Sequence, residues 1–249
     1  MRNWSIPAGR IFGVEIRVHL TFLFLLIFVW LTESTPHVPA NPGRGLALVG
    51  IVFGSVVLHE LGHALVGKRA GIPAKAIILL PIGGVTLLDE TQRPLEPGLL
   101  TWKRDIRIAV AGPVVNIVIA IVASGILLAV APQIHLWTRP YVYSGNLPRS
   151  LVWSNLWLAL FNLLPAYPMD GGRVLRAWFS RSMDPVRATR RAVSIGQAFA
   201  TLFMLVGMLQ SAYVGLTMIG FFLFIAAQLE ERSAVFQSVL ETVRRKISC

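Results

Sequence analysis

The sequence contains a single cysteine, Cys249, and few charged residues. One cysteine excludes an internal disulfide bond and any metal site built on two or more thiolates. Charged residues make up 14% of the chain, against about a quarter in soluble domains, while hydrophobic residues make up 55%. This composition excludes an ordinary soluble domain. It predicts a membrane protein whose helices cross the bilayer several times.

Long apolar runs predict six transmembrane helices with short connections. They lie at about residues 18–32, 46–66, 106–130, 151–167, 192–210 and 213–228. The first run is short and could also be the apolar core of a signal peptide, but we interpret it as a retained first helix. We therefore expect an all-α six-span domain over residues 1–229 and a polar, amphipathic cytoplasmic tail over residues 230–249.

Acidic residues are scarcer than basic ones, 12 against 23, and the formal net charge is +11. Such a charge suits a nucleic-acid binder, or a membrane protein that keeps its basic residues on the cytoplasmic side. With the N-terminus inside, 20 of the 23 basic residues fall on the inner side, and only Arg44, Arg139 and Arg149 fall outside. This asymmetry predicts cytoplasmic termini and explains the charge without nucleic acid.

The second predicted span contains the sequence VVLHELGHALVG at residues 56–67. His59 and His63 lie on one face of a helix, because residues i and i+4 are neighbours there, and two imidazoles so placed can bind one metal ion. Glu60 can act as general base on a metal-activated water. The alternatives are two buried structural histidines, and a glutamate that only orients one of them. Ionisable groups within a membrane span favour the functional interpretation.

A catalytic zinc needs a third protein ligand and an open position for water. Asp170 is the best candidate, since it follows a span that Pro165 and Pro168 must break, and two glycines follow it. The alternative for Asp170 is a helix cap. Competing ligands that fit equally well as solvated interface charges are Asp89, Glu90 and Asp105.

Two further segments predict strands near this site. Apolar and polar residues alternate from Phe12 to Val18, and residues 71–90 combine β-branched residues with Pro81 and Gly83-Gly84, which predicts a β-hairpin. Strand edges within a bilayer must be buried in protein or line a wet cavity, so we expect the hairpin beside the active site, paired with the first strand.

Two asparagines, Asn116 and Asn162, lie within predicted spans. Hydrogen bonds between helices are the usual reason for such residues, and they are our main interpretation for Asn116. Asn162 precedes the broken segment and could hold substrate backbone or a developing oxyanion. We count both, with the two hairpin glycines, as candidate substrate-binding residues.

Four segments together resemble the site-2 protease family of intramembrane zinc metalloproteases. They are HELGH at 59–63, the Gly83-Gly84 hairpin, AGPVVN at 111–116 and NLLPAYPMDGG at 162–172, while GVEIRVHLTF at 13–22 resembles its compact bacterial and archaeal branch. The resemblance implies one zinc ion held by His59, His63 and Asp170, with Glu60 as base. It also implies that Asn162 and the hairpin position an unwound substrate strand. Relatives often carry a CBS or PDZ domain, and we recognise neither in this chain.

The predicted function is hydrolysis of peptide bonds in transmembrane segments of membrane-tethered regulators or remnant signal peptides. The alternatives are a membrane metal transporter and a catalytically inactive membrane scaffold. Expected partners are a membrane-protein substrate and the lipid bilayer, with a regulatory membrane protein or a second copy of the chain as further candidates. We expect a plasma-membrane protein whose active site lies in the cytoplasmic half of the bilayer.

Overall fold

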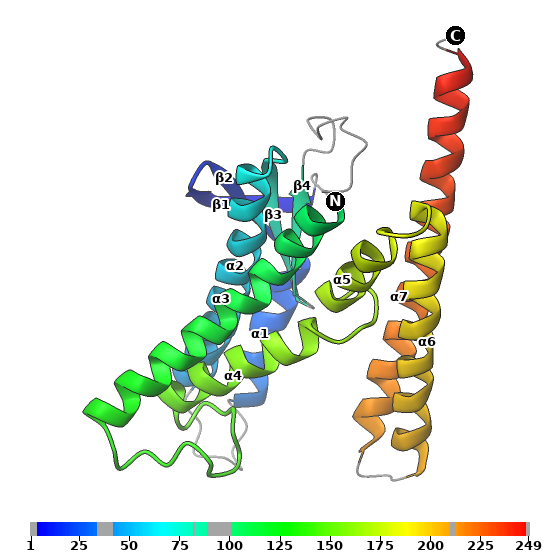
Figure 1. Cartoon of the computed structure of the whole chain (residues 1–249). Coiled ribbons are helices and arrows are strands. Elements are labelled where there is room, and N and C mark those ends of the chain that lie inside the picture. The colour runs from blue at the N-terminus through cyan, green and yellow to red at the C-terminus, as the bar shows by residue number, and fades with distance from the viewer. Residues whose placement is uncertain (1–3, 34–41, 82, 89–100, 210–212, 248–249) are drawn as a thin grey trace. The chain divides into compact units, whose positions relative to one another are not determined.

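The computed structural model describes residues 4–33, 42–81, 83–88, 101–209 and 213–247, and it is mostly helical with one small sheet (Figure 1). The elements in chain order are β1 (Ser5–Ile11), β2 (Val14–His19), α1 (Thr21–Glu33), α2 (Pro42–Arg69), β3 (Ala74–Leu80), β4 (Gly83–Leu88), α3 (Thr101–Val130), α4 (Leu147–Asn162), α5 (Asp170–Phe179), α6 (Pro185–Leu209) and α7 (Val214–Ile247). The chain divides into two compact units. The first unit holds residues 1–95 and 111–160, and the second holds residues 96–110 and 161–249.

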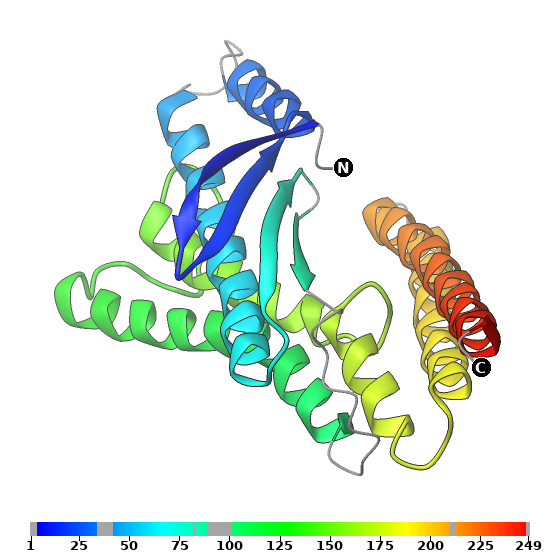
Figure 2. The same cartoon turned by 90° about the horizontal axis from the view of Figure 1, so that it is seen from above.

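The sheet of the first unit has the strand order β1-β2-β3-β4 (Figure 2). β1 and β2 pair antiparallel, β2 and β3 pair parallel, and β3 and β4 pair antiparallel. The predicted hairpin is therefore present, and the predicted pairing with the N-terminal strand is confirmed. In the parallel pair Ile16 lies opposite Ile77, and the chain between these two residues contains α1 and α2.

The predicted strand from Phe12 to Val18 has its start in the wrong place. Phe12 and Gly13 form the turn of an extra hairpin, and both have positive φ, 52° and 86°. Two such residues give the turn whose twist matches that of the flanking strands. The preceding strand, β1, was missed because Pro7 and Gly9 disfavour a strand; it tolerates them as an edge strand with a bulge between them.

Gly83 and Gly84 also differ from the prediction, because they begin β4 instead of forming the turn before it. Gly83 has a φ of 141°, a conformation that favours glycine. Gly84 is paired with Leu79 of β3. The last two residues of the predicted hairpin, 89 and 90, lie outside the described residues.

One face of the sheet packs against α2, as Figures 1 and 2 show. The buried residues of this core are Val14, Ile16, Ile77 and Leu79 from the strands, and Val56, Leu61 and Ala64 from α2. Alternation along β2 puts its apolar residues on that face. The packed part of α2 is the part that carries the HELGH motif, so the sheet fixes the surroundings of the candidate site.

Four helices of the described chain are long and apolar enough to cross a membrane: α2, α3, α6 and the first part of α7. These match the predicted second, third, fifth and sixth spans. The predicted first and fourth spans are the shorter helices α1, of 13 residues, and α4, of 16 residues. α7 continues without a break past residue 230, so the predicted tail extends the last helix.

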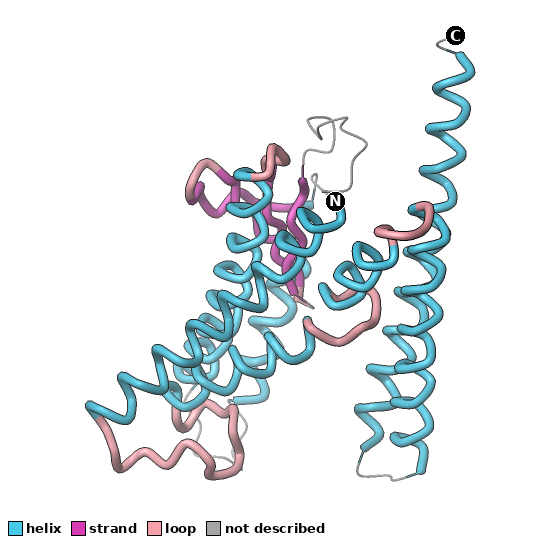
Figure 3. Tube along the Cα trace, viewed as in Figure 1, coloured by secondary structure: helices cyan, strands magenta, loops and turns pink. Residues whose placement is uncertain are grey.

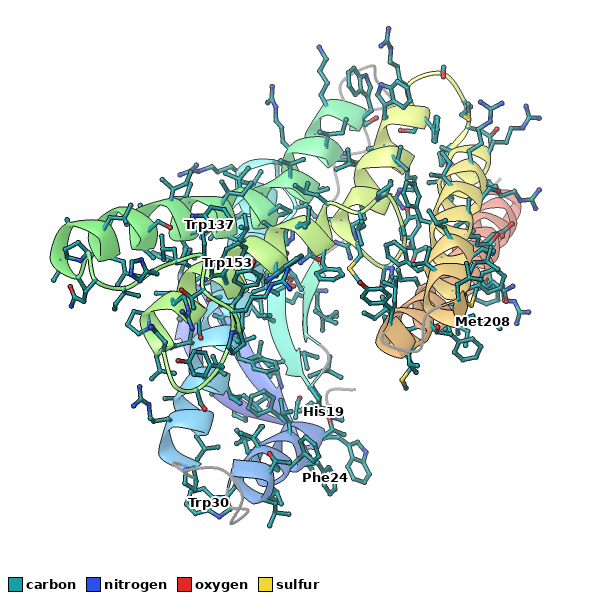
Figure 4. The ribbon with its side chains drawn as sticks, turned by 90° about the horizontal axis from the view of Figure 1, so that it is seen from below. His19, Phe24, Trp30, Trp137, Trp153 and Met208 are labelled. Carbon is teal, nitrogen blue, oxygen red and sulfur yellow. The ribbon has the colours of Figure 1, made fainter. Side chains whose placement is uncertain are left out.

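The connection between α3 and α4 is held by aromatic and basic side chains. Trp153 of α4 donates its indole N–H to the Leu136 carbonyl, 2.7 Å away, and its ring packs edge-on against Trp137 (Figure 4). Arg149 is buried and donates to the carbonyls of His135 and Pro140. These bonds fix where α4 enters the first unit, and therefore where its polar residues lie.

In the second unit, α6 and α7 lie side by side as a helical hairpin (Figure 3). Small residues permit the close approach: a Cβ added to Gly220 would lie 2.6 Å from the Ala200 carbonyl oxygen. Ala192, Val193 and Ala227 form a small core with Tyr167, which comes from the segment between α4 and α5. α4 ends at Asn162, before both prolines and earlier than the predicted end at about residue 167, and a new helix starts at Asp170.

Candidate metal centre

His59 and His63 occupy successive turns of α2, as their spacing predicts. Both are buried, and their Nε2 atoms lie 3.1 Å apart. Two nitrogens bound to one tetrahedral zinc at 2.0–2.1 Å would be separated by about 3.3 Å. The described geometry therefore fits one shared metal ion.

Gly112 of α3 keeps the space in front of the two histidines open. A Cβ at this position would lie 2.6 Å from Nε2 of His59 and would also overlap Nε2 of His63. α3 comes this near because Gly62 lets it approach α2; a Cβ on Gly62 would lie 2.9 Å from the Ala111 carbonyl oxygen. The missing side chain at position 112 leaves a cradle next to both nitrogens, which supports the fit of a metal ion.

The other ring nitrogen of His59 contacts α3. Its Nδ1 lies 2.5 Å from Oδ1 of Asn116, which is fully buried. Nδ2 of Asn116 in turn donates to Asn155 of α4, at 2.7 Å. The main interpretation of Asn116, a hydrogen bond between helices, agrees with these contacts. A substrate-binding role for Asn116 stays a prediction, and its lack of exposed surface gives that role no support.

Glu60 faces the β4 strand. Thr86 donates its hydroxyl to Oε2 of Glu60 at 2.5 Å. Gly84 lies close to the same side chain, because an added Cβ there would be 2.7 Å from Cγ of Glu60 and 3.0 Å from a methyl carbon of Val56. The two β4 residues therefore position the carboxylate, one by a hydrogen bond and one by leaving room.

Asp170 belongs to the second unit, where it is the first residue of α5 and is buried. Its carboxylate lies 4.0 Å from Arg173. The N-cap position of α5 is held by Met169, so Asp170 is not the cap that its position allowed. Gly171 follows within the helix, and a side chain there would overlap the carbonyls of Leu163 and Leu164. Glycine at this position therefore allows α5 to pack closely against the segment that precedes it.

The other predicted residues are distributed as follows. The first unit brings His59, Glu60, His63, Asn116 and Gly84 together, whereas Asn162 is the half-buried last residue of α4 and belongs to the second unit with Asp170. Of the competing ligands, Asp105 lies 3.8 Å from Arg104 in an ion pair. Asp89 and Glu90 lie outside the described residues.

Three residues of this site were missed in the sequence: Thr86, Gly112 and Asn155. Asn155 carries a signal that could have found it, because an amide in the middle of an apolar run is as unusual there as Asn116 is. Gly112 is four residues before Asn116 and therefore on the same helix face. Thr86 carries no such signal, since threonine is common in strands.

Comparison with known proteins decides the family. The model of peptidase family M50 matches residues 47–144 and 142–206, which together cover more than half of the chain. The chain belongs to peptidase family M50. The matched residues include α2 with its histidine pair, Gly112 and Asp170.

Individual M50 relatives agree with this assignment. A zinc metalloprotease of Methanocaldococcus jannaschii is 34% identical over 98% of this chain, and the stage IV sporulation protein FB of Bacillus subtilis is 29% identical over 70%. The chain spans 66% of the length of the first relative and 54% of the second. The solved structure of a site-2 protease from M. jannaschii matches with a TM-score of 0.63 and 34% identity, covering 92% of this chain and 95% of that one.

Proposed function

We propose that this chain is the membrane-embedded catalytic part of an intramembrane zinc metalloendopeptidase. Its substrates are transmembrane segments of membrane-tethered regulators or remnant signal peptides. The observation that carries the proposal is the pairing of His59 and His63, with their Nε2 atoms 3.1 Å apart, beside the cradle that Gly112 leaves open. This pair lies on a helix long and apolar enough to cross a membrane.

Zinc is held by His59, His63 and Asp170, three buried side chains of the kinds that zinc prefers. When bound there it supplies Lewis-acid chemistry to water and to the peptide carbonyl. Glu60 takes a proton from the attacking water and passes it to the leaving amine. Thr86 holds the carboxylate through a hydrogen bond to Oε2.

A membrane-spanning substrate hides its carbonyls in helical hydrogen bonds, so it must unwind before hydrolysis. β4 offers a place for the unwound strand, because it is the last strand in the order of the described sheet and Glu60 contacts it. Backbone pairing along such an edge is a common mode of peptide recognition. Gly83 and Gly84 leave this end of β4 free of side chains, and Asn162 is assigned to substrate backbone or the oxyanion.

The domain crosses the membrane six times, with both termini in the cytoplasm. The parallel pairing of β2 with β3 supports this, because both strands then lie on the same side and the intervening chain crosses an even number of times. α2 is long enough to cross, and an even number of crossings is then reached when α1 crosses as well, which supports the proposed first span. α1 is only about 20 Å long at 1.5 Å per residue. A longer helix is not needed, because α1 follows directly after the sheet, and the sheet packs against α2 beside the histidines.

The charge distribution supports the same orientation, with the site in the cytoplasmic half of the bilayer. Residues 1–229 form the protease domain and residues 230–249 the cytoplasmic tail, of which the part up to Ile247 continues α7. A regulatory membrane protein or a second copy of the chain is a candidate partner.

The test compares zinc content and cleavage of a membrane-embedded reporter in the wild type, Glu60→Gln and Asp170→Asn. Glu60→Gln should keep zinc and lose cleavage, because the amide cannot accept the proton. Asp170→Asn should weaken zinc binding. Undiminished cleavage by Glu60→Gln would refute the mechanism. Zinc flux in proteoliposomes that persists in Glu60→Gln would instead indicate a transporter, and tight zinc binding without cleavage by the wild type would indicate a scaffold.

A further inference from the structure

A chain of buried hydrogen bonds leads from His59 through α3 and α4 and back to α2. Nδ1 of His59 contacts Asn116 at 2.5 Å, Asn116 contacts Asn155 at 2.7 Å, and Asn155 contacts Ser55 at 2.9 Å. Ser55 lies on the same helix as His59, and all four side chains are buried. The chain of contacts therefore passes through α3 and α4 and returns to α2.

The direction of each bond follows from the end of the chain. Ser55 donates its hydroxyl proton to the Ile51 carbonyl at 2.8 Å, so its oxygen accepts from Nδ2 of Asn155. The second proton on Nδ2 of Asn155 goes to the Leu151 carbonyl, at 2.8 Å. Both donors of Asn155 are then used, and its Oδ1 is the atom left to face Asn116.

The orientation of the Asn116 amide is fixed once the orientation of the Asn155 amide is fixed. Its Nδ2 donates to Oδ1 of Asn155, so its own Oδ1 faces His59. An oxygen in that place can only accept, and Nδ1 of His59 must therefore carry the proton. The lone pair of the neutral ring is then on Nε2, the atom beside the Gly112 cradle.

We propose that Asn155 is a positioning residue for the metal, acting through its hydrogen bond to Asn116. It fixes the orientation of the Asn116 amide, and through it the nitrogen of His59 that is free to bind zinc. The inference rests on the proposed metal site. Without Asn155, the Asn116 amide can rotate and present Nδ2 to Nδ1 of His59. That contact favours the neutral ring form with its proton on Nε2. In this form Nε2 has no lone pair with which to bind zinc.

The experiment uses zinc affinity, measured by competition with a chromophoric chelator in detergent. Asn155→Leu keeps the number of side-chain heavy atoms and the branching at Cγ, and it should weaken zinc binding by roughly 10- to 100-fold, the usual effect of losing a partner that orients a ligand. Asn155→Ala serves the same comparison if the leucine does not fit. Ser55→Ala should have a smaller effect, because the Leu151 carbonyl still holds Nδ2 of Asn155.

A second variant separates orientation of the ring from simple packing. Asn116→Asp places a carboxylate against Nδ1 of His59, and a carboxylate has no donor end to rotate into that place. The double variant Asn116→Asp/Asn155→Leu should therefore bind zinc within about three-fold of Asn116→Asp alone, within the scatter usual for independent sites. A merely structural Asn155 predicts the opposite, since the double variant would lose as much affinity as Asn155→Leu does.

Nitrogen-15 NMR of the histidines in zinc-free protein supplies an independent readout. The wild type and the double variant should show His59 protonated on Nδ1, and Asn155→Leu should show a mixture of the two neutral forms. Wild-type zinc affinity in Asn155→Leu, or an unchanged His59 spectrum, would overturn the inference. A wild type that binds no zinc would instead refute the proposed function.

Discussion

Replacing Gly112 by alanine would put a methyl group between the two histidines. The new Cβ would lie 2.6 Å from Nε2 of His59, whereas ordinary van der Waals contact begins near 3.4 Å. The ring would have to retreat by about 0.8 Å, and His63 would have to move as well. Metal–ligand distances tolerate only about ±0.2 Å, so the two nitrogens could no longer share one ion.

The expected result for Gly112→Ala is a loss of zinc affinity of at least 100-fold. Losing a partner that merely orients a ligand already costs roughly 10- to 100-fold, and here the ligands themselves are displaced. The fold should survive, since alanine in a helix interior is favoured over glycine by about 0.5–1 kcal/mol. Zinc affinity is measured by chelator competition, and the melting temperature of the zinc-free protein reports the fold.

Gly125 provides the matched control, because it lies on the same helix and nothing lies within 4 Å of its added Cβ. Gly125→Ala should bind zinc like the wild type. If Gly112→Ala also bound zinc with wild-type affinity and an unchanged melting temperature, the ion would not lie between His59 and His63, and the proposed site would be wrong.

Two further predictions concern the base and the helical hairpin. Thr86→Val removes the hydroxyl that donates to Glu60, so kcat for the reporter should fall by about ten-fold, which is about 1.4 kcal/mol, with unchanged zinc content; an unchanged kcat would show that Thr86 does not position Glu60. Gly220→Ala would force a methyl group to 2.6 Å from the Ala200 carbonyl and should destabilise the protein by about 1–3 kcal/mol in thermal unfolding. Gly215→Ala, with nothing within 4 Å, is its control, and equal melting temperatures of the two variants would contradict the packing described for α6 and α7.

The pairing of His59 and His63 could be predicted because it depends on local spacing. The spacing of His59 and His63 fixes their common face on any helix, and an apolar run around them is a strong signal. The hairpin at β3 and β4 was predictable for the same reason. β1 was not, because Pro7 and Gly9 disfavour a strand and are tolerated only at the edge that the finished sheet provides.

The surroundings of the site depend on contacts between distant segments, and these leave little trace in the sequence. Gly112 and Thr86 contribute to the site only because α3 and β4 approach α2. The first predicted span corresponds to the 13-residue helix α1, and its crossing stays a prediction, because α2, α3, α6 and the first part of α7 are the candidate spans among the described helices.

The parallel pairing of β2 with β3 also sets an order of events during synthesis. Ile77 leaves the ribosome about 60 residues after its partner Ile16, which is roughly 3–12 s at typical rates of 5–20 residues per second. During that interval the N-terminal hairpin stands alone, and two-stranded hairpins are marginally stable. β4 joins last, bringing Thr86 to Glu60. The helix that carries Glu60 is thus made before the strand that contacts it, and both are made before Gly112 and Asp170, so the proposed metal site is the last part of this region to be completed.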